Sequence, residues 1–431
     1  MRRLWLGVVA LVLAAGVSGA SAGAAPRALV TERAVLVMRH GIRAPLSGEV
    51  PEGTRTAAPW PRWSVADSVI TPHGARALAI VAGADRAWLA ARGLLAARGC
   101  PARGTVAIVS NSSDRTIASG AAYAQGLAPG CGLRVAHRAP GVVDPLFEPL
   151  RGRATAFDAR AAVVDINSAT GGMQALVDRH RADIALLDRV LGCGSDCVPA
   201  LPPRVVAEAD GHGITLDGAI RGTSGVAQVL LLQYLEGMPA ASVGWGRADA
   251  ATLQRLGALH AALFAVFTRP SYMAAHQASL LGRRIVDSLA RGPRLQVLMG
   301  HDTNVTAVAA VLRVDLVAPG YATNDVPPGG ALLFERVRDT RTGGRFIRVS
   351  YRTQAPGVLR AGGRAISVVP LVMAGCARPL CPADRVVAAI EARIAAPLRD
   401  RSARATRSRH SQARTPSVSA KPPLSAPAAR A

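Results

Sequence analysis

Residues 34–45 read Ala-Val-Leu-Val-Met-Arg-His-Gly-Ile-Arg-Ala-Pro, an apolar run followed by a charged turn. The run is typical of a strand buried on both faces, so it delivers Arg39, His40 and Arg43 to the end of a core strand. Charged side chains are rarely buried without a partner, and this cluster therefore predicts an anionic ligand such as phosphate. The alternative is a surface turn that happens to carry two arginines in an Arg-rich chain.

Two further apolar runs end at polar side chains in the same way. Residues 294–300 are followed by His301 and Asp302, and a helical pattern comes next, so this pair lies near a helix N-terminus that favours anions. Residues 105–109 are followed by Arg115. Because ligands bind outside the carboxyl ends of parallel strands, we expect these side chains to meet those of the first run at one site.

The residue types at this site suit the hydrolysis of a phosphate monoester. We expect His40 to attack phosphorus as a neutral imidazole and to form a phosphohistidine, because neighbouring arginines lower its pKa. We expect Asp302 to protonate the leaving alcohol, which predicts an acidic pH optimum. The chemistry requires no metal and no cofactor. Forked or ring N–H donors to the phosphate oxygens are expected from Arg39, Arg43, Arg115 and His301.

The N-terminus has the pattern of a secretory signal peptide. Residues 1–22 contain a charged start, an apolar run and a small-residue cleavage site. A membrane anchor is the alternative, but the run is short and has no charged stop after it, and no other stretch approaches a membrane span. We therefore expect a periplasmic or secreted protein without an integral membrane span.

Charge and composition narrow the class of partner. The chain has 431 residues and a formal net charge of +23, yet almost all of its basic residues are arginines. Aromatic residues make up only 4%, and no basic helix carries stacking aromatics, so nucleic acid is not an expected partner. Residues 398–431 are rich in Arg, Ser, Ala and Pro, which predicts a disordered basic tail. The tail either contacts anionic envelope surfaces or has no binding role.

The spacing of apolar residues predicts three regions. Residues 27–157 alternate strands with helices, the pattern of a parallel sheet. Residues 158–282 have helical spacing throughout, with His180 and His260 expected as packing or surface residues rather than catalytic ones. Strands return in residues 283–397. The prediction is an α/β catalytic domain in two pieces, with a helical insertion that caps the strand ends.

Six cysteines behind a signal peptide favour disulfides in an oxidising compartment. A zinc site is the competing interpretation. It is disfavoured because Cys193 and Cys197 lack a second close pair of ligands. The sequence by itself leaves the connectivity open.

The same motifs resemble a known family. Residues 39–45 (Arg-His-Gly-Ile-Arg-Ala-Pro) and 301–304 (His-Asp-Thr-Asn) are similar to the two signatures of the histidine acid phosphatases, in the bacterial periplasmic branch of phytases and glucose-1-phosphatases. The similarity continues in consistent order over about residues 30–397. It implies a phosphoglycerate-mutase-like α/β domain with a helical insertion, and an exported acid phosphatase acting on phytate or sugar phosphates. It also implies the disulfides Cys100–Cys131, Cys193–Cys197 and Cys376–Cys381, where relatives often carry a fourth.

Details of the motifs point to different substrates. Leu46 and Ser47 stand where phytases often have Thr-Lys, which removes a contact to a distal phosphate, and Leu46 resembles the glucose-1-phosphatase version. Gly41 and Thr303 resemble the phytases. We therefore expect a broad phosphomonoesterase. Two other functions remain as alternatives: a phosphate- or phosphosugar-binding protein, which needs no Asp302, and a phosphomutase-like transferase, which export disfavours.

Overall fold

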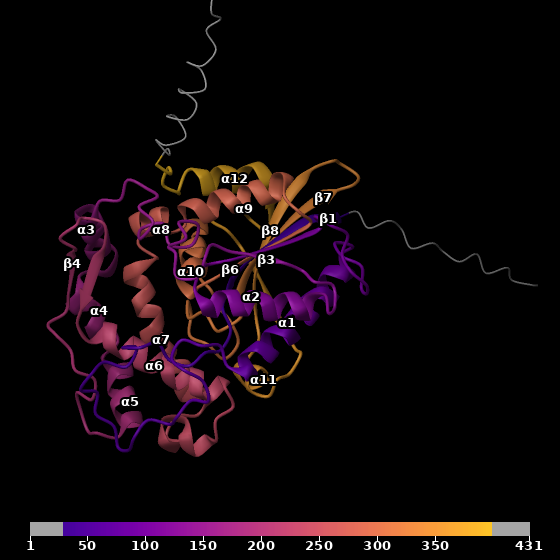
Figure 1. Ribbon diagram of the computed structural model, residues 1–431. Coiled ribbons are helices and arrows are strands. Elements are labelled where there is room, and N and C mark those ends of the chain that lie inside the picture. The colour runs from indigo at the N-terminus through magenta and orange to yellow at the C-terminus, as the bar shows by residue number, and fades with distance from the viewer. Residues whose placement is uncertain (1–28, 399–431) are drawn as a thin grey trace, which may run out of the picture.

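A computed structural model describes residues 29–398 of the chain (Figure 1). The predicted signal peptide and nearly all of the predicted basic tail lie outside the described residues. The described part has a mixed α/β architecture, built on one large central sheet with helices on both of its faces.

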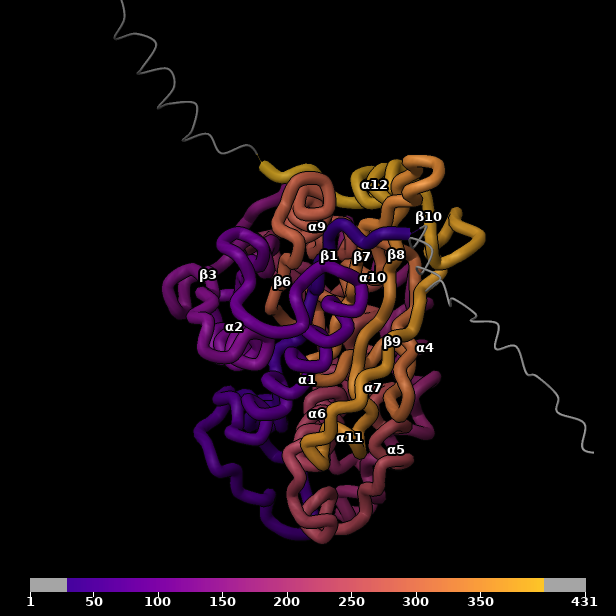
Figure 2. Tube along the Cα trace, turned by 90° about the vertical axis from the view of Figure 1, so that its right-hand side faces the viewer, coloured from indigo at the N-terminus to yellow at the C-terminus, as the bar shows by residue number. Residues whose placement is uncertain are grey.

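The central sheet has eight strands in the order β10-β8-β7-β1-β6-β2-β3, with β9 paired to β8. Its parallel part consists of β1 (Leu29–Arg39), β6 (Leu295–Gly300), β2 (Val106–Ser110) and β3 (Val135–Ala136). Its antiparallel part consists of β7 (Ala331–Asp339), β8 (Arg345–Thr353), β9 (Ser367–Leu371) and β10 (Leu380–Pro382). Figure 2 shows β1 between β6 and β7, far from both in the sequence.

The predicted α/β fold is confirmed, and the strands of residues 27–157 lie in its parallel part, while the later strands β7 to β10 add an antiparallel part. The physical reason lies in the connection between β7 and β8, which is a short turn after Asp339. A parallel crossover needs a dozen or more residues, so two strands joined this tightly pair antiparallel. The parallel half, which carries the motifs, agrees with the prediction.

Strand β1 explains why two helical layers form. Ala34, Leu36 and Met38 pack in one hydrophobic cluster, whereas Val35 and Val37 pack in another on the opposite face. With apolar residues on both faces, β1 requires cover on both sides. One face is covered by α1 (Pro72–Ala91) and α2 (Asp114–Leu127), and the other by α9 (Ser279–Arg291), α10 (Asp302–Leu312) and α12 (Ala383–Glu391) (Figure 1).

A second group of elements lies beside the sheet (Figure 1). It contains α3 (Ala159–Thr170), α4 (Met173–Arg179), α5 (Arg181–Leu191), α6 (Ala219–Leu235), η1 (Ala240–Gly246), α7 (Ala250–Phe267) and α8 (Ser271–Gln277). The short helix α11 (Pro356–Arg360) contacts α6 from the later part of the chain.

The all-helical prediction for this region is wrong at one place. Strands β4 (Arg204–Ala207) and β5 (Ile214–Asp217) form an antiparallel hairpin. The physical reason is the alternation of buried and exposed side chains along the two strands. Val205, Ile214 and Leu216 are buried, while their neighbours along each strand are more exposed. This alternation, with glycines in the connecting segment, is a hairpin pattern of period two.

Helix α7 has the composition of a membrane span, although no stretch after the leader was predicted to approach one. Among the described helices it alone passes this test, with a mean hydropathy of 1.3. Apolar core helices pass the same test, and 44% of the window in α7 is buried inside the protein. The helix packs against α5 and α6, with Leu256, Leu259 and Phe264 buried. These contacts are those of a core helix.

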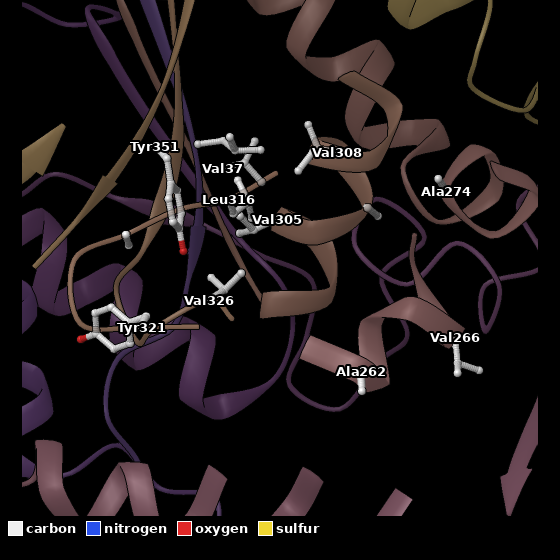
Figure 3. Packing of buried hydrophobic residues seen from close by; sticks show 14 of the residues in the cluster. Val37, Ala262, Val266, Ala274, Val305, Val308, Leu316, Tyr321, Val326 and Tyr351 are labelled. Atoms are coloured by element: carbon white, nitrogen blue, oxygen red, sulfur yellow. The ribbon is translucent and has the colours of Figure 1, made fainter. Parts of the chain in front are cut away.

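A continuous apolar core holds α10 against the end of β1. Val305 and Val308 of α10 lie close to Val37 of β1, with Tyr351 and Val326 nearby (Figure 3). All five side chains are at most 2% exposed. Full burial of such side chains contributes roughly 1.5 to 3 kcal/mol each. This packing fixes the start of α10, and therefore His301 and Asp302, relative to the end of β1.

The structure contains the three disulfides that the family resemblance implied. Cys100 is bonded to Cys131, which ties the chain after α1 to the chain after α2. The other two bridges close short loops, Cys193–Cys197 and Cys376–Cys381. No cysteine of the described residues is free.

Candidate active site

The carboxyl ends of β1, β6 and β2 meet at one edge of the sheet. The backbone N–H of His40 donates to the Gly300 carbonyl at 2.9 Å, and that of Asn111 donates to the Met299 carbonyl at 2.9 Å. The three predicted strand-end motifs therefore start from neighbouring points. The structure brings together Arg39, His40, Arg43, Arg115, His301 and Asp302 around this edge.

His40 is held in a defined orientation and tautomer. Its ring is 3% exposed, and Nδ1 lies 2.9 Å from the Gly41 carbonyl oxygen. Burial, followed by the charges of Arg39 and Arg43, lowers the pKa of His40 well below its ordinary value of 6.5. A carbonyl oxygen only accepts, so the neutral ring carries its hydrogen on Nδ1 and its lone pair on Nε2. The ring nitrogen with a free lone pair is thus Nε2.

Arg39 and Asp302 form an ion pair behind the histidines. Arg39 is fully buried, and its Nη2 lies 3.0 Å from Asp302 Oδ2 and 2.8 Å from Gln228 Oε1. Its Nη1 donates to the Val326 carbonyl. Burial by itself would raise the pKa of Asp302, but the charge of Arg39 and the hydrogen bond from His260 hold that pKa well below its ordinary value. Asp302 is therefore ionised in the free protein.

His301 is neutral over almost the whole pH range. Burial, followed by the charge of Arg115, lowers its pKa to about 3. Its Nε2 lies 3.1 Å from Asn111 Oδ1, an oxygen that also accepts from Ser113, so Nε2–H donates to Asn111. Its Nδ1 lies 3.5 Å from Arg115 Nη2. The donor predicted to bind phosphate is therefore directed at Asn111 in this structure.

Arg43 has a partner that the sequence did not predict. Its Nη1 and Nη2 bind the two carboxylate oxygens of Glu49 at 2.7 and 2.9 Å, and Nη1 also donates to the Ala44 carbonyl. The Nε atoms of Arg39, Arg43 and Arg115 are buried without a partner among the described residues. Buried donors without partners are rare, and an anion beside them lowers their energy. The three arginines therefore make the site receptive to an anion.

These side chains line a cleft of about 420 Å³. His40, Arg43, Arg115, His301 and Asp302 lie on its wall, and Arg39 lies behind Asp302. Helices α6 and α7 also line the cleft and contribute Ser224 and His260 among others. Residues 29–398 contain no group of three or more His, Cys, Asp and Glu side chains placed to share a metal ion.

Several known proteins are similar to this chain in sequence and in fold. No protein-family model matches the chain. The phytase AppA of Escherichia coli is 33% identical over 351 residues, which cover 75% of this chain and 80% of that protein. The chain belongs to the histidine acid phosphatases. A glucose-1-phosphatase of Salmonella typhimurium is 25% identical over 394 residues, covering 85% of this phosphatase and 94% of the relative.

Solved structures agree with this assignment. The Hafnia alvei phytase in complex with tartrate superposes with a TM-score of 0.79 at 27% identity, covering 86% of this phosphatase and 98% of that chain. The Citrobacter braakii phytase gives a TM-score of 0.78 at 26% identity, with coverage of 85% and 98%. The phosphatase therefore has the α/β fold of the bacterial phytases.

His260 lies closer to the candidate site than sequence reasoning predicted. The helical spacing around it predicted a packing or surface role, and its side chain is indeed buried, at 8% exposure. However, its Nε2 lies 3.4 Å from Asp302 Oδ2, and its Nδ1 lies 3.0 Å from Ser224 Oγ. No local pattern marks it, because the packing of α6 on α7 places it at the cleft. His180, by contrast, lies near Asp183 outside the cleft, as predicted for a surface residue.

Proposed function

We propose that this phosphatase hydrolyses phosphomonoesters through a phosphohistidine on His40, with sugar phosphates and phytate as its substrate candidates. The observation that carries the proposal is the state of His40. Its Nε2 lone pair is free of a proton and stands among Arg39, Arg43 and Arg115. The printed names of the relatives, a phytase and a glucose-1-phosphatase, support both substrate candidates.

In the first step, His40 Nε2 attacks phosphorus while the arginines neutralise the phosphate oxygens. The transfer depends mainly on positioning and on stabilisation of charge, which these fixed guanidinium groups supply. His301 adds a donor when a phosphate oxygen replaces Asn111 as the acceptor of its Nε2–H. Because His301 is neutral, it contributes a hydrogen bond rather than a charge.

Asp302 has to hold a proton when the alcohol leaves, although it is ionised in the free protein. In mild acid a phosphate monoester enters as a monoanion, because its second pKa is about 6. The arginines favour the dianion, and the added negative charge raises the affinity of Asp302 for a proton. The proton therefore moves from the phosphate to Asp302, which then gives it to the leaving oxygen. The substrate itself supplies the acid form.

The disulfides support export of the protein, and the cleft lining supports the division into domains. Three disulfides are typical of proteins from oxidising compartments, which agrees with the predicted leader and a periplasmic or secreted location. We infer that residues 158–282 form an insertion that covers the strand ends of an α/β domain made of residues 27–157 and 283–397. Ser224 and His260 of that insertion line the same cleft as His40, which supports this division.

Replacing Asp302 with asparagine tests the proposal. Asparagine keeps the shape of the side chain but cannot supply the proton, and general acid catalysis contributes about a hundredfold to ten-thousandfold. Turnover of glycerol phosphate, whose leaving group is a basic alkoxide, should fall by that factor. Turnover of p-nitrophenyl phosphate should fall far less, because nitrophenolate leaves without a proton. Initial rates on both substrates provide the measurement.

Asp315→Asn is the matched control, since Asp315 is an exposed aspartate that pairs with Arg269 away from the cleft. Equal damage on both substrates would mean that Asp302 is not the leaving-group acid. Tight phosphate binding by the wild type without any turnover would instead favour the phosphate-binding alternative.

A further inference from the structure

Glu49 places a negative charge inside a site that binds an anion. Its carboxylate accepts two hydrogen bonds from Arg43 and a third from the Leu46 backbone N–H at 2.7 Å. The side chain of Glu49 is only 9% exposed, and that of Arg43 only 4%. The positive charge of Arg43 is therefore already balanced by the carboxylate of Glu49 on the cleft wall. The proposed phosphatase chemistry assigns no role to Glu49.

The fold holds Glu49 in this position from two sides. Its backbone N–H donates to the Leu46 carbonyl at 3.0 Å, which closes a turn between the two residues. Helix α6 packs against that turn at Gly225. A Cβ atom added at Gly225 would lie 2.0 Å from the Glu49 carbonyl oxygen. Only glycine permits this close approach. The carboxylate is therefore a fixed part of the wall and not a side chain that can leave with little cost.

The remaining charges on the cleft wall also leave little positive charge for a second phosphate. Beyond Arg43 and Arg115, the cleft is lined by the arginines Arg151 and Arg221. Arg151 is already paired with Glu148, another carboxylate on the wall. Both arginines are exposed at the rim, where ion pairs contribute little. Arg221 has no carboxylate partner among the described residues, so a second phosphate next to the reacting one would meet one free cation at the rim and the two carboxylates of Glu49 and Glu148.

We propose that Glu49 is a specificity-determining residue, whose fixed carboxylate selects esters with a single phosphate over polyphosphorylated substrates. The inference rests on the proposed phosphatase activity and assigns the substrate class of that site. The arginines suffice for the one phosphate that reacts, while each further phosphate is repelled by the carboxylates. Repulsion between like charges across a protected site is a common means of rejecting a wrong ligand.

The test compares Glu49→Gln with Glu49→Asp and with the wild type. The measured quantity is the ratio of kcat/KM on phytate to kcat/KM on glucose 1-phosphate. The wild type should favour glucose 1-phosphate. Glu49→Gln removes the charge and should raise the ratio by about tenfold, the effect of one nearby charge in a partly solvated site. Glu49→Asp keeps the charge and should keep the wild-type ratio, even where its turnover is lower.

Glu52→Gln is the matched control, because Glu52 is an exposed glutamate three positions further along the chain. An unchanged ratio in Glu49→Gln, an equal rise in Glu49→Asp, or a wild type that favours phytate would each overturn the proposal. Calorimetric binding of phytate and of inorganic phosphate in a His40→Ala background, where turnover is abolished, gives the corresponding ratio without hydrolysis. A wild type that binds both but hydrolyses neither would refute the phosphatase activity and still decide the role of Glu49.

Discussion

Replacing His301 with glutamine should make the folded protein less sensitive to acid. Burial and the charge of Arg115 lower the pKa of His301 from 6.5 to about 3 in the folded state. The unfolded chain therefore takes up a proton below 6.5 that the folded chain does not take up until about 3. Stability contributed by this residue falls as the pH drops through that window, because the unfolded state binds more protons there.

The size of the effect follows from the width of the window. Each pKa unit corresponds to about 1.4 kcal/mol, so at about pH 4.5 the cost of keeping His301 neutral reaches about 2.7 kcal/mol. Glutamine does not titrate and can still donate to Asn111. Between about pH 7 and about pH 4.5, the variant should therefore lose about 2.7 kcal/mol less free energy of unfolding than the wild type.

Urea denaturation at the two pH values, with the disulfides intact, measures this difference. His137→Gln is the control, because His137 is an exposed histidine outside the cleft and sets the baseline for losing a histidine. If the wild type and His301→Gln lose stability in parallel, to within about 0.5 kcal/mol, His301 is not held neutral by its surroundings and the assignment of its tautomer fails with it.

Two further outcomes are expected. His40→Ala should abolish turnover of every substrate, because all substrates react with the same nucleophile. Acid quench of the wild type during turnover should trap labelled phosphate on a histidine, and finding none would refute the covalent step. Asp85→Asn should lower the free energy of unfolding by about 3 to 5 kcal/mol, because it leaves the buried guanidinium of Arg352 without its counter-ion. The pair is 2.9 Å apart with both side chains buried, and the exposed Asp287→Asn is the control in urea denaturation.

The sequence predicted the parts of the site that are encoded locally. An apolar strand that stops at polar side chains is a short-range pattern, so the positions of His40, Arg115 and His301 at strand ends followed from it. The start of α10 at Asp302 followed in the same way. Because ligands bind outside the carboxyl ends of parallel strands, these three ends were expected to meet at one site without any knowledge of tertiary contacts.

The parts that sequence reasoning missed depend on contacts between distant elements. Glu49 lies next to Arg43 because Gly225 of α6 packs closely against the turn that carries Glu49. His260 lies next to Asp302 because α7 packs on α6. Apolar periodicity reports that a helix has a buried face, but it does not report what lies against that face. The protonation state of Asp302 was missed for the same reason, since it is set by Arg39 and His260 together.

The parallel pairing of β1 with β6 also has a consequence for biogenesis. Arg39 and Gly300 are neighbours in the sheet although they are about 260 residues apart in the chain. Contacts of such long range form late, after the entropy of closing a large loop has been overcome. The side chains of His40 and Asp302 therefore remain separated until β6 has been synthesised and has paired with β1. A nascent chain that ends before β6 has no complete candidate site, so phosphate esters meet the assembled cleft only after folding has finished.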